Sequence, residues 1–300
     1  SWAGGARVNC RFPMKKQELT GVCYELEVSG LLGGHSGGEI HKERGNSNCI
    51  LGRLLWKLSE KMPVGLVSVD GGLADNAIPR QTKAVVVVEE KDAASLEQQV
   101  AALAAELADE LATKDPDVKV TAKRLADTAE TITCAAPEAT KRVAAFLQAT
   151  PNGVQAMSAD MPGLVQTSLN LGILKADEEV LRAEYSVRSS VESEKDNLIA
   201  KLSALVELTG GDYVVTGDYP GWKYRVHSPL REKMVKLYAE MYGNEPRVEA
   251  IHAGLECGLL GSKISDLDCV SMGPDMKDIH TTEETLSISS TKRVWEYLVK

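Results

Sequence analysis

One long apolar stripe limits the folds open to this chain more than any other feature of its sequence. Five apolar side chains recur there at steps of three or four residues: Leu96, Val100, Leu103, Leu107 and Leu111. This spacing is typical of one face of an α-helix. We therefore predict a helix over residues 93–113 that packs against a sheet. A contact between two copies of the chain would use the same stripe but is not required by it.

Strand and helix patterns alternate around this predicted helix. Residues 21–30 alternate as a strand does, and the runs "VGLVSVDGG" and "KAVVVVEE" are rich in β-branched residues. Helical stripes lie in "NSNCILGRLLWKLSEK", in residues 136–150 and in residues 193–208, and residues 165–190 alternate as a hairpin. This order favours an α+β domain, in which helices cover one face of a mainly antiparallel sheet.

The pattern changes after "YPGW". Ser228 and Pro229 form a helix start, as N-cap and first helical residue, and this helix should run to Gly243. A strand is predicted at "DCVSMGP" and a last helix at "STKRVWEYLVK". About 80 residues with so few strands cannot bury a core of their own. We expect this part to be the tail of a larger α/β domain whose front half is not in this chain.

Composition and charge exclude several classes of partner. The net charge is −9 with a pI of about 5.2, and no block of Lys and Arg occurs, so nucleic acid is not an expected partner. No apolar run approaches the roughly 20 residues that span a bilayer, and the N-terminus lacks a signal-peptide pattern. The six cysteines are scattered without a CxxC pair, which favours free thiols in a reducing compartment and a cytoplasmic protein.

Three short stretches contain the side chains best suited to chemistry. Four glycines bracket His35 in "GGHSGG", which indicates a turning backbone, but a metal ligand, a catalytic base, a substrate contact and an idle loop histidine all remain open. His280 in "DIHTTEE" is the best metal candidate, because loops after strands of α/β domains often hold sites. Arg188 ends an apolar strand and would suit a carboxylate ligand, or equally the surface.

Six motifs in order give the chain a specific resemblance. The stretches "GLLGGHSGGEIH", "DNAIPR", "TPNGV", "YPGW", "IHAGLECGL" and "SMGPDMKDIHTTEE" resemble the aminoacyl-histidine dipeptidases, also called Xaa-His or bacterial carnosinase-like dipeptidases. These belong to the dizinc exopeptidases, with carboxypeptidase G and succinyl-diaminopimelate desuccinylase. The resemblance covers essentially the whole chain.

The resemblance implies a lid or dimerisation domain at residues 3–216 and the C-terminal segment of an α/β catalytic domain at residues 217–300. It implies zinc-dependent hydrolysis of dipeptides such as β-alanyl-histidine, with two zinc ions per intact site, which other divalent metals could replace. The family's HxD ligand pair, bridging Asp, Glu-Glu base and next acidic ligand would lie in the front segment, so this chain alone should be inactive. Expected partners are a dipeptide, a second copy through the lid, and an N-terminal fragment of the same protein.

Site residues follow from the same resemblance, position by position. His280 matches a metal ligand, and His35 matches a lid histidine that reaches the scissile carbonyl from its own or the opposite subunit. Residues expected to contact substrate are Asn76, Arg188, Glu256, Gly273 and Pro274, with Arg188 on the substrate carboxylate. Two alternatives remain open: a related amide hydrolase such as a deacylase, and a non-catalytic dimerisation module.

Overall fold

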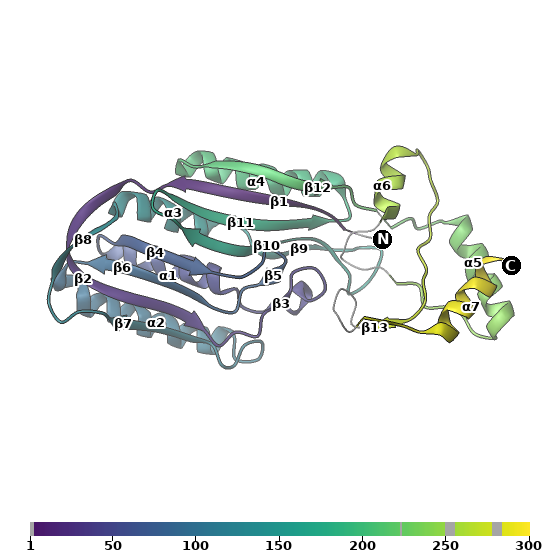
Figure 1. The fold of residues 1–300 in the computed structure, drawn as a ribbon, viewed down its shortest axis with the longest axis horizontal. Helices are drawn as coiled ribbons and strands as arrows, with labels where there is room; N and C mark the ends of the chain where they lie inside the picture. Colours follow the sequence, from purple (N-terminus) through teal and green to yellow (C-terminus); the bar gives the residue numbers. More distant parts are fainter. Residues whose placement is uncertain (1–2, 223, 250–255, 278–283) are drawn as a thin grey trace.

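The computed structural model describes residues 3–222, 224–249, 256–277 and 284–300. A large sheet with its helices forms one end of an elongated molecule, and the described residues from 220 onward form the other end (Figure 1). We call residues 4–219 the sheet domain and residues 220–300 the C-terminal segment. The sheet domain is an antiparallel sheet with helices packed on it, as the sequence predicts.

The first half of the sheet domain consists of two consecutive strand–helix–strand units. Its strands lie in the order β4-β6-β2-β7, and every neighbouring pair is antiparallel. Its elements are β2 (Lys16–Ser29), α1 (Ser47–Lys61), β4 (Gly65–Gly71), β6 (Thr82–Val88), α2 (Ala93–Glu110) and β7 (Lys119–Arg124).

The second half repeats this arrangement, with its first strand taken from the start of the chain. Its strands lie in the order β10-β11-β1-β12, again antiparallel. Its elements are β1 (Gly4–Pro13), α3 (Pro137–Ala149), β10 (Val165–Ala176), β11 (Val180–Ser189), α4 (Glu192–Thr209) and β12 (Asp212–Tyr219). The sheet domain therefore contains two similar halves related by an approximate two-fold axis.

The two halves meet where β4 pairs with β10. Gly71 lies opposite Leu174, and Asp70 lies opposite Lys175. Four shorter strands also belong to the domain: β8 (Glu130–Ala135) pairs with β2 and β4, β9 (Gly153–Met157) pairs with β10, and β3 (Gly34–His35) pairs with β5 (Ala77–Ile78). Two 3-10 turns, Ile40–Lys42 and Glu90–Asp92, complete the domain.

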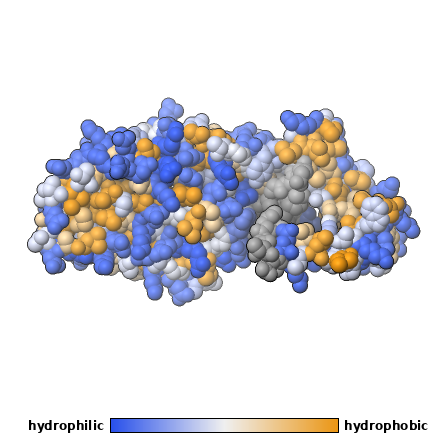
Figure 2. Space-filling model, viewed as in Figure 1, coloured by the Kyte–Doolittle hydropathy of each residue, from blue (hydrophilic) through white to orange (hydrophobic). Residues whose placement is uncertain are grey.

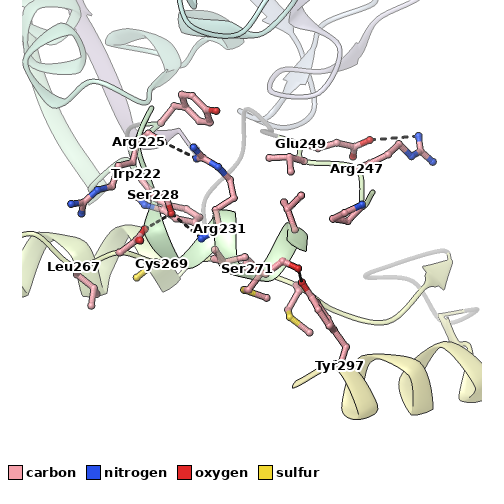
Figure 3. A pocket seen from close by; sticks show the side chains of 18 residues that line it. Trp222, Arg225, Ser228, Arg231, Arg247, Glu249, Leu267, Cys269, Ser271 and Tyr297 are labelled. Atoms are coloured by element: carbon pink, nitrogen blue, oxygen red, sulfur yellow. Dashed lines mark hydrogen bonds and ion pairs between the residues drawn. The ribbon is translucent and has the colours of Figure 1, made fainter. Parts of the chain in front are cut away.

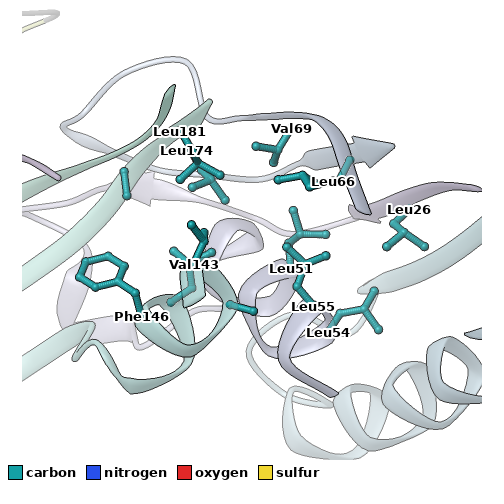
Figure 4. Packing of buried hydrophobic residues seen from close by; sticks show 14 of the residues in the cluster. Leu26, Leu51, Leu54, Leu55, Leu66, Val69, Val143, Phe146, Leu174 and Leu181 are labelled. Atoms are coloured by element: carbon teal, nitrogen blue, oxygen red, sulfur yellow. The ribbon is translucent and has the colours of Figure 1, made fainter. Parts of the chain in front are cut away.

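One hydrophobic core runs through both halves. Leu51 of α1, Leu66 of β4, Val143 of α3 and Leu174 of β10 belong to the same buried cluster (Figure 4). The predicted helices at 93–113, 136–150 and 193–208 are confirmed, and the apolar stripe of α2 is buried against the sheet, apart from Leu111 at its end, which is half-buried. Because the helices of the two halves share a core, the halves are not independent domains.

The C-terminal segment is built differently. It contains α5 (Pro229–Tyr242), α6 (Glu256–Lys263), α7 (Ile288–Leu298) and a small pair of strands, β13 (Met276–Lys277) and β14 (Thr285–Leu286). The N-cap prediction is confirmed, because the hydroxyl of Ser228 accepts the N–H of Arg231. The strand predicted at residues 268–274 is wrong: none of the strands in the described ranges pairs with this stretch, and an extended backbone without a partner is not a sheet.

This segment has no hydrophobic core among its described residues. Among the described residues the last buried hydrophobic side chain is Val206, whereas Leu260, Ile288, Trp295 and Leu298 are all more than half exposed. Apolar surface gathers over this end of the molecule in Figure 2. No helix within the described ranges is long and apolar enough to cross a membrane.

Gly72, just after β4, gives a direct test of the junction between the halves. Its φ is +81°, and a Cβ at this position would lie 1.8 Å from the carbonyl oxygen of Gly172 on β10. Gly163 has a φ of +83° but open space around it. We predict that Gly163→Ala costs about 1 kcal/mol of unfolding free energy, from backbone strain alone. Gly72→Ala should cost about 3 kcal/mol, because the strand must also shift.

Chemical denaturation of the two variants measures this difference. Equal losses of stability would show that the loop after β4 does not rest on β10.

Candidate active site

His35 lies on β3, in a loop whose glycines are required by its shape. Gly33 has a φ of +67° and Gly34 a φ of +140°, and a Cβ on Gly34 would lie 2.7 Å from a carboxylate oxygen of Glu39. His35 pairs with Ala77 on β5. The next residue, Ser36, donates its N–H to the carbonyl of Asn76 at 2.9 Å. The loop therefore brings His35 and Asn76 together.

The imidazole of His35 has a defined hydrogen-bonding state. Its Nδ1 accepts the backbone N–H groups of Gly37, at 3.1 Å, and Gly38, at 3.0 Å. A nitrogen that accepts two such bonds carries no proton, so in the neutral ring the proton lies on Nε2. Burial, and then the positive charge of Arg188, lower the pKa of His35, while Glu39 raises it. His35 is thus suited to donate a hydrogen bond from Nε2 as a neutral ring.

Arg188 contributes the positive charge of this region. It lies near the end of β11, and only 9% of the residue is exposed. Its Nε has no hydrogen-bond partner, and no carboxylate in the described part of the chain forms an ion pair with it. A buried guanidinium without a counter-ion favours an anionic ligand, and its planar donors suit a carboxylate.

These residues lie at the same end of the sheet domain. In Figure 1, β3 lies at the end nearest the C-terminal segment, and β11 runs toward that end. Asn76 is exposed there, next to β5. The structure therefore brings three of the predicted residues, His35, Asn76 and Arg188, to one region.

The other predicted residues belong to the C-terminal segment. Gly273 is exposed and Pro274 is half-buried. The loop is fixed next to them, because the N–H of Asp275 donates to the hydroxyl of Ser290 at 2.7 Å. Glu256 begins α6, but its side chain is outside the described part, and so is all of His280.

The described residues do not form a metal site. No group of three or more His, Cys, Asp or Glu side chains within the described ranges could hold a metal ion. A structural or catalytic zinc ion in proteins needs three or four such ligands. The zinc expected from the resemblance therefore has no donor set in this part of the molecule.

A pocket of about 190 Å³ in the C-terminal segment contains none of the predicted site residues (Figure 3). Two arginines in its wall are already bonded to backbone carbonyls. Arg231 donates to the carbonyls of Arg225 and Val226, and Arg225 donates to the carbonyls of His227 and Asp266. These arginines hold the turn before α5, so we do not assign them to a substrate.

One buried polar residue was missed by the sequence analysis. Asn170 on β10 is 1% exposed, and its side chain donates to the carbonyls of Ala77 and Asp75 on either side of Asn76. Its only signal in the sequence is a polar residue between Leu169 and Leu171 in a predicted strand.

Comparison with known proteins gives three findings. Residues 26–115, most of the first half of the sheet domain, match the peptidase dimerisation domain. The chain is 33% identical over 277 residues to the cytosol non-specific dipeptidase of Escherichia coli (strain K12), covering 92% of this chain and 56% of that protein. The crystal structure of aminoacylhistidine dipeptidase from Vibrio alginolyticus superimposes with a TM-score of 0.91 and 31% identity, covering 99% of this chain and 60% of that one. The chain thus spans little more than half the length of either protein.

Glu39 leads to a prediction on pH dependence. A hydrogen bond from Lys42 and another from the N–H of His35 lower the pKa of Glu39 from 4.5 to about 2. A carboxyl whose pKa is lower in the folded state stabilises the fold above its unfolded pKa, and this contribution is lost as the pH falls from about 4.5 toward 2. The unfolding free energy, measured in urea, should therefore fall less between pH 5 and pH 3 for Glu39→Gln than for the unchanged chain. Identical pH profiles would refute this role of Glu39.

A second prediction concerns metal content. The purified 300-residue chain should not retain two zinc ions per molecule after dialysis against zinc-containing buffer, because its described residues offer no ligand cluster. Elemental analysis measures this ratio. Two tightly held zinc ions per chain would contradict the prediction.

Proposed function

Because this chain carries a peptidase dimerisation domain and is related to a dipeptidase over 92% of its length, we propose that it forms the lid and C-terminal part of a dipeptidase. The observation on which the proposal rests is the shared location of a neutral histidine donor and a buried arginine that has no carboxylate partner in the described part of the chain. A free dipeptide has a carbonyl to be cleaved and, one residue away, a carboxylate. These are the two groups that such a pair would bind.

Each side chain then has a distinct task. Arg188 binds the substrate carboxylate through parallel N–H donors and fixes the orientation of the peptide. His35 donates from Nε2 to the carbonyl oxygen, and this bond strengthens as the oxygen becomes negative in the transition state. Asn76, exposed beside His35, contacts the substrate backbone. Its carbonyl accepts the N–H of Ser36, which fixes its backbone beside His35.

The substrate class is the finer part of the proposal. The similarity to an aminoacylhistidine dipeptidase supports Xaa-His dipeptides, of the β-alanyl-histidine type, and the similarity to a non-specific dipeptidase supports a broader range. A deacylase would also bind a carboxylate but would not need the free amine of a dipeptide. Rates on β-alanyl-histidine, other dipeptides and N-acetyl-histidine separate these three cases.

The remaining parts of the active site are assigned to the catalytic domain. We propose that a further polypeptide segment of the whole enzyme covers the apolar face of α6 and α7 and provides most of the metal ligands. His280 would complete them, with zinc as the expected metal, and Glu256, Gly273 and Pro274 would border the substrate. The metal would supply Lewis acidity to the reaction when bound.

Quaternary structure and location are part of the same proposal. A homodimer is proposed from the dimerisation domain, with a cytoplasmic location from the six free thiols and the cytosolic relative. His35 and Arg188 lie together in one chain, so the proposed site does not need a second subunit to bring these two residues together.

Kinetics of the whole enzyme test the two assignments. His35→Ala should lower kcat about 10²–10³-fold with little change in KM, because an oxyanion contact acts mainly in the transition state. Arg188→Ala should instead raise KM, because the carboxylate is bound in the ground state and the transition state alike.

Arg182, on the same strand but only half-buried, is the control for Arg188. Arg182→Ala should leave both constants within about twofold of the wild type. Unchanged kcat in His35→Ala, or a loss of zinc from that variant, would overturn the assignment of His35.

A further inference from the structure

Asn170 occupies an unusual place between the two halves of the sheet domain. It lies on β10 in the second half, yet its Nδ2 donates to two carbonyls of the first half, those of Ala77 at 2.9 Å and Asp75 at 3.3 Å. Its Oδ1 accepts from Asn46, whose own Oδ1 caps the start of α1. All these bonds are buried or partly buried, where an unmade bond costs more than in water.

The segment that Asn170 holds is the one that positions His35. Ala77, whose carbonyl Asn170 binds, is the β5 residue that pairs with His35. Asn76 lies between the two carbonyls bound by Asn170, and its own carbonyl accepts the N–H of Ser36. Loss of the Asn170 amide would therefore release the segment with Asn76 and β5, and with it the strand β3 that contains His35.

Other contacts fix the same segment to the second half but do not reach His35. Arg7 of β1 forms an ion pair with Asp75. A Cβ on Gly172 would lie 2.5 Å from the carbonyl oxygen of Asp75, so the segment rests directly on the backbone of β10. Asn170 alone among these residues bonds to the residue paired with His35.

β10 is also the neighbour of the strand that contains Arg188. Ser168 on β10 lies opposite Arg188 on β11, two residues along the strand from Asn170. One strand thus sets the location of both groups. We propose that Asn170 is a positioning residue that holds His35 in register with Arg188, an inference that rests on the proposed function for its catalytic consequence.

The first test needs no catalytic activity. In the 300-residue chain, ¹⁵N NMR of the histidine rings should show His35 with a proton fixed on Nε2. Asn170→Ala should give His35 signals of mixed tautomers, because the loop that fixes Nδ1 against Gly37 and Gly38 is released. Asn152→Ala is the matched control. Asn152 also bonds to β10, because it accepts the N–H of Leu171, but its side chain forms no hydrogen bond to β3 or β5 among the described residues. Its His35 signals should be those of the unchanged chain.

The second test measures kinetics in the whole enzyme. Asn170→Ala should lower kcat about 10-fold to 100-fold with KM within about threefold, since a small displacement of a reacting group has effects of this size. Asn170→Asp keeps the side-chain volume and an oxygen for Asn46 but has no N–H for the two carbonyls, and it stands in for Asn170→Ala if that variant does not fold. The kcat of Asn170→Asp should fall about as much as that of Asn170→Ala. Asn152→Ala should retain kcat within about twofold while losing some thermal stability, because it also removes a bond to β10.

The two tests separate the positioning role from the proposed function. Unchanged His35 signals in a folded Asn170 variant, or full activity of Asn170→Asp, would overturn the positioning role even in an active dipeptidase. Altered His35 signals in an enzyme that cleaves no dipeptide would support the positioning role and refute the proposed function.

Discussion

The pairing of β4 with β10 is the interaction on which the rest of the sheet domain depends. It is short, with Asp70 and Gly71 opposite Lys175 and Leu174, yet it makes one sheet out of two similar halves. Because β4 ends at this junction, the residues that follow it must pass over β10. Gly72 and Gly172 permit this close passage, since a side chain at either position would strike the backbone opposite. This loop leads into β5, the strand that pairs with His35 on β3.

This arrangement explains how one chain combines groups that lie 153 positions apart in the sequence, His35 and Arg188. The first half contributes a histidine whose Nδ1 accepts two backbone N–H groups. The second contributes a buried arginine that forms no ion pair with a carboxylate among the described residues. Burial, and then the positive charge of Arg188, lower the pKa of His35 and so favour the neutral ring. A protonated His35 ring would be repelled by Arg188, but the neutral ring is not. Both side chains can therefore bind the same substrate.

The sequence predicts the elements well and their partners poorly. Helical stripes and β-branched runs depend on local periodicity, so α2, α3, α4 and the β10–β11 hairpin could be predicted from them. The two-fold arrangement could not, because β1 and α3 are far apart along the chain and nothing in their patterns pairs them. Residues 268–274 resemble a strand in sequence, but no described strand pairs with them. The glycines around His35 indicated a turning loop, whereas Asn170 looked like an ordinary polar residue of a strand. The resemblance provided His280 and Glu256, whose side chains are outside the described part, and their roles stay predictions.

The central claim is that His35 and Arg188 of the same chain serve one active site. The most direct measurement is the activity of mixed dimers formed from His35→Ala and Arg188→Ala subunits of the whole enzyme, carrying different tags and purified through both. If both residues act within one chain, every site in the mixed dimer contains one defect, and activity should stay at the low level of the separate variants. If the two residues come from different subunits, one of the two sites would be intact, and recovery of about half the wild-type activity would contradict this account.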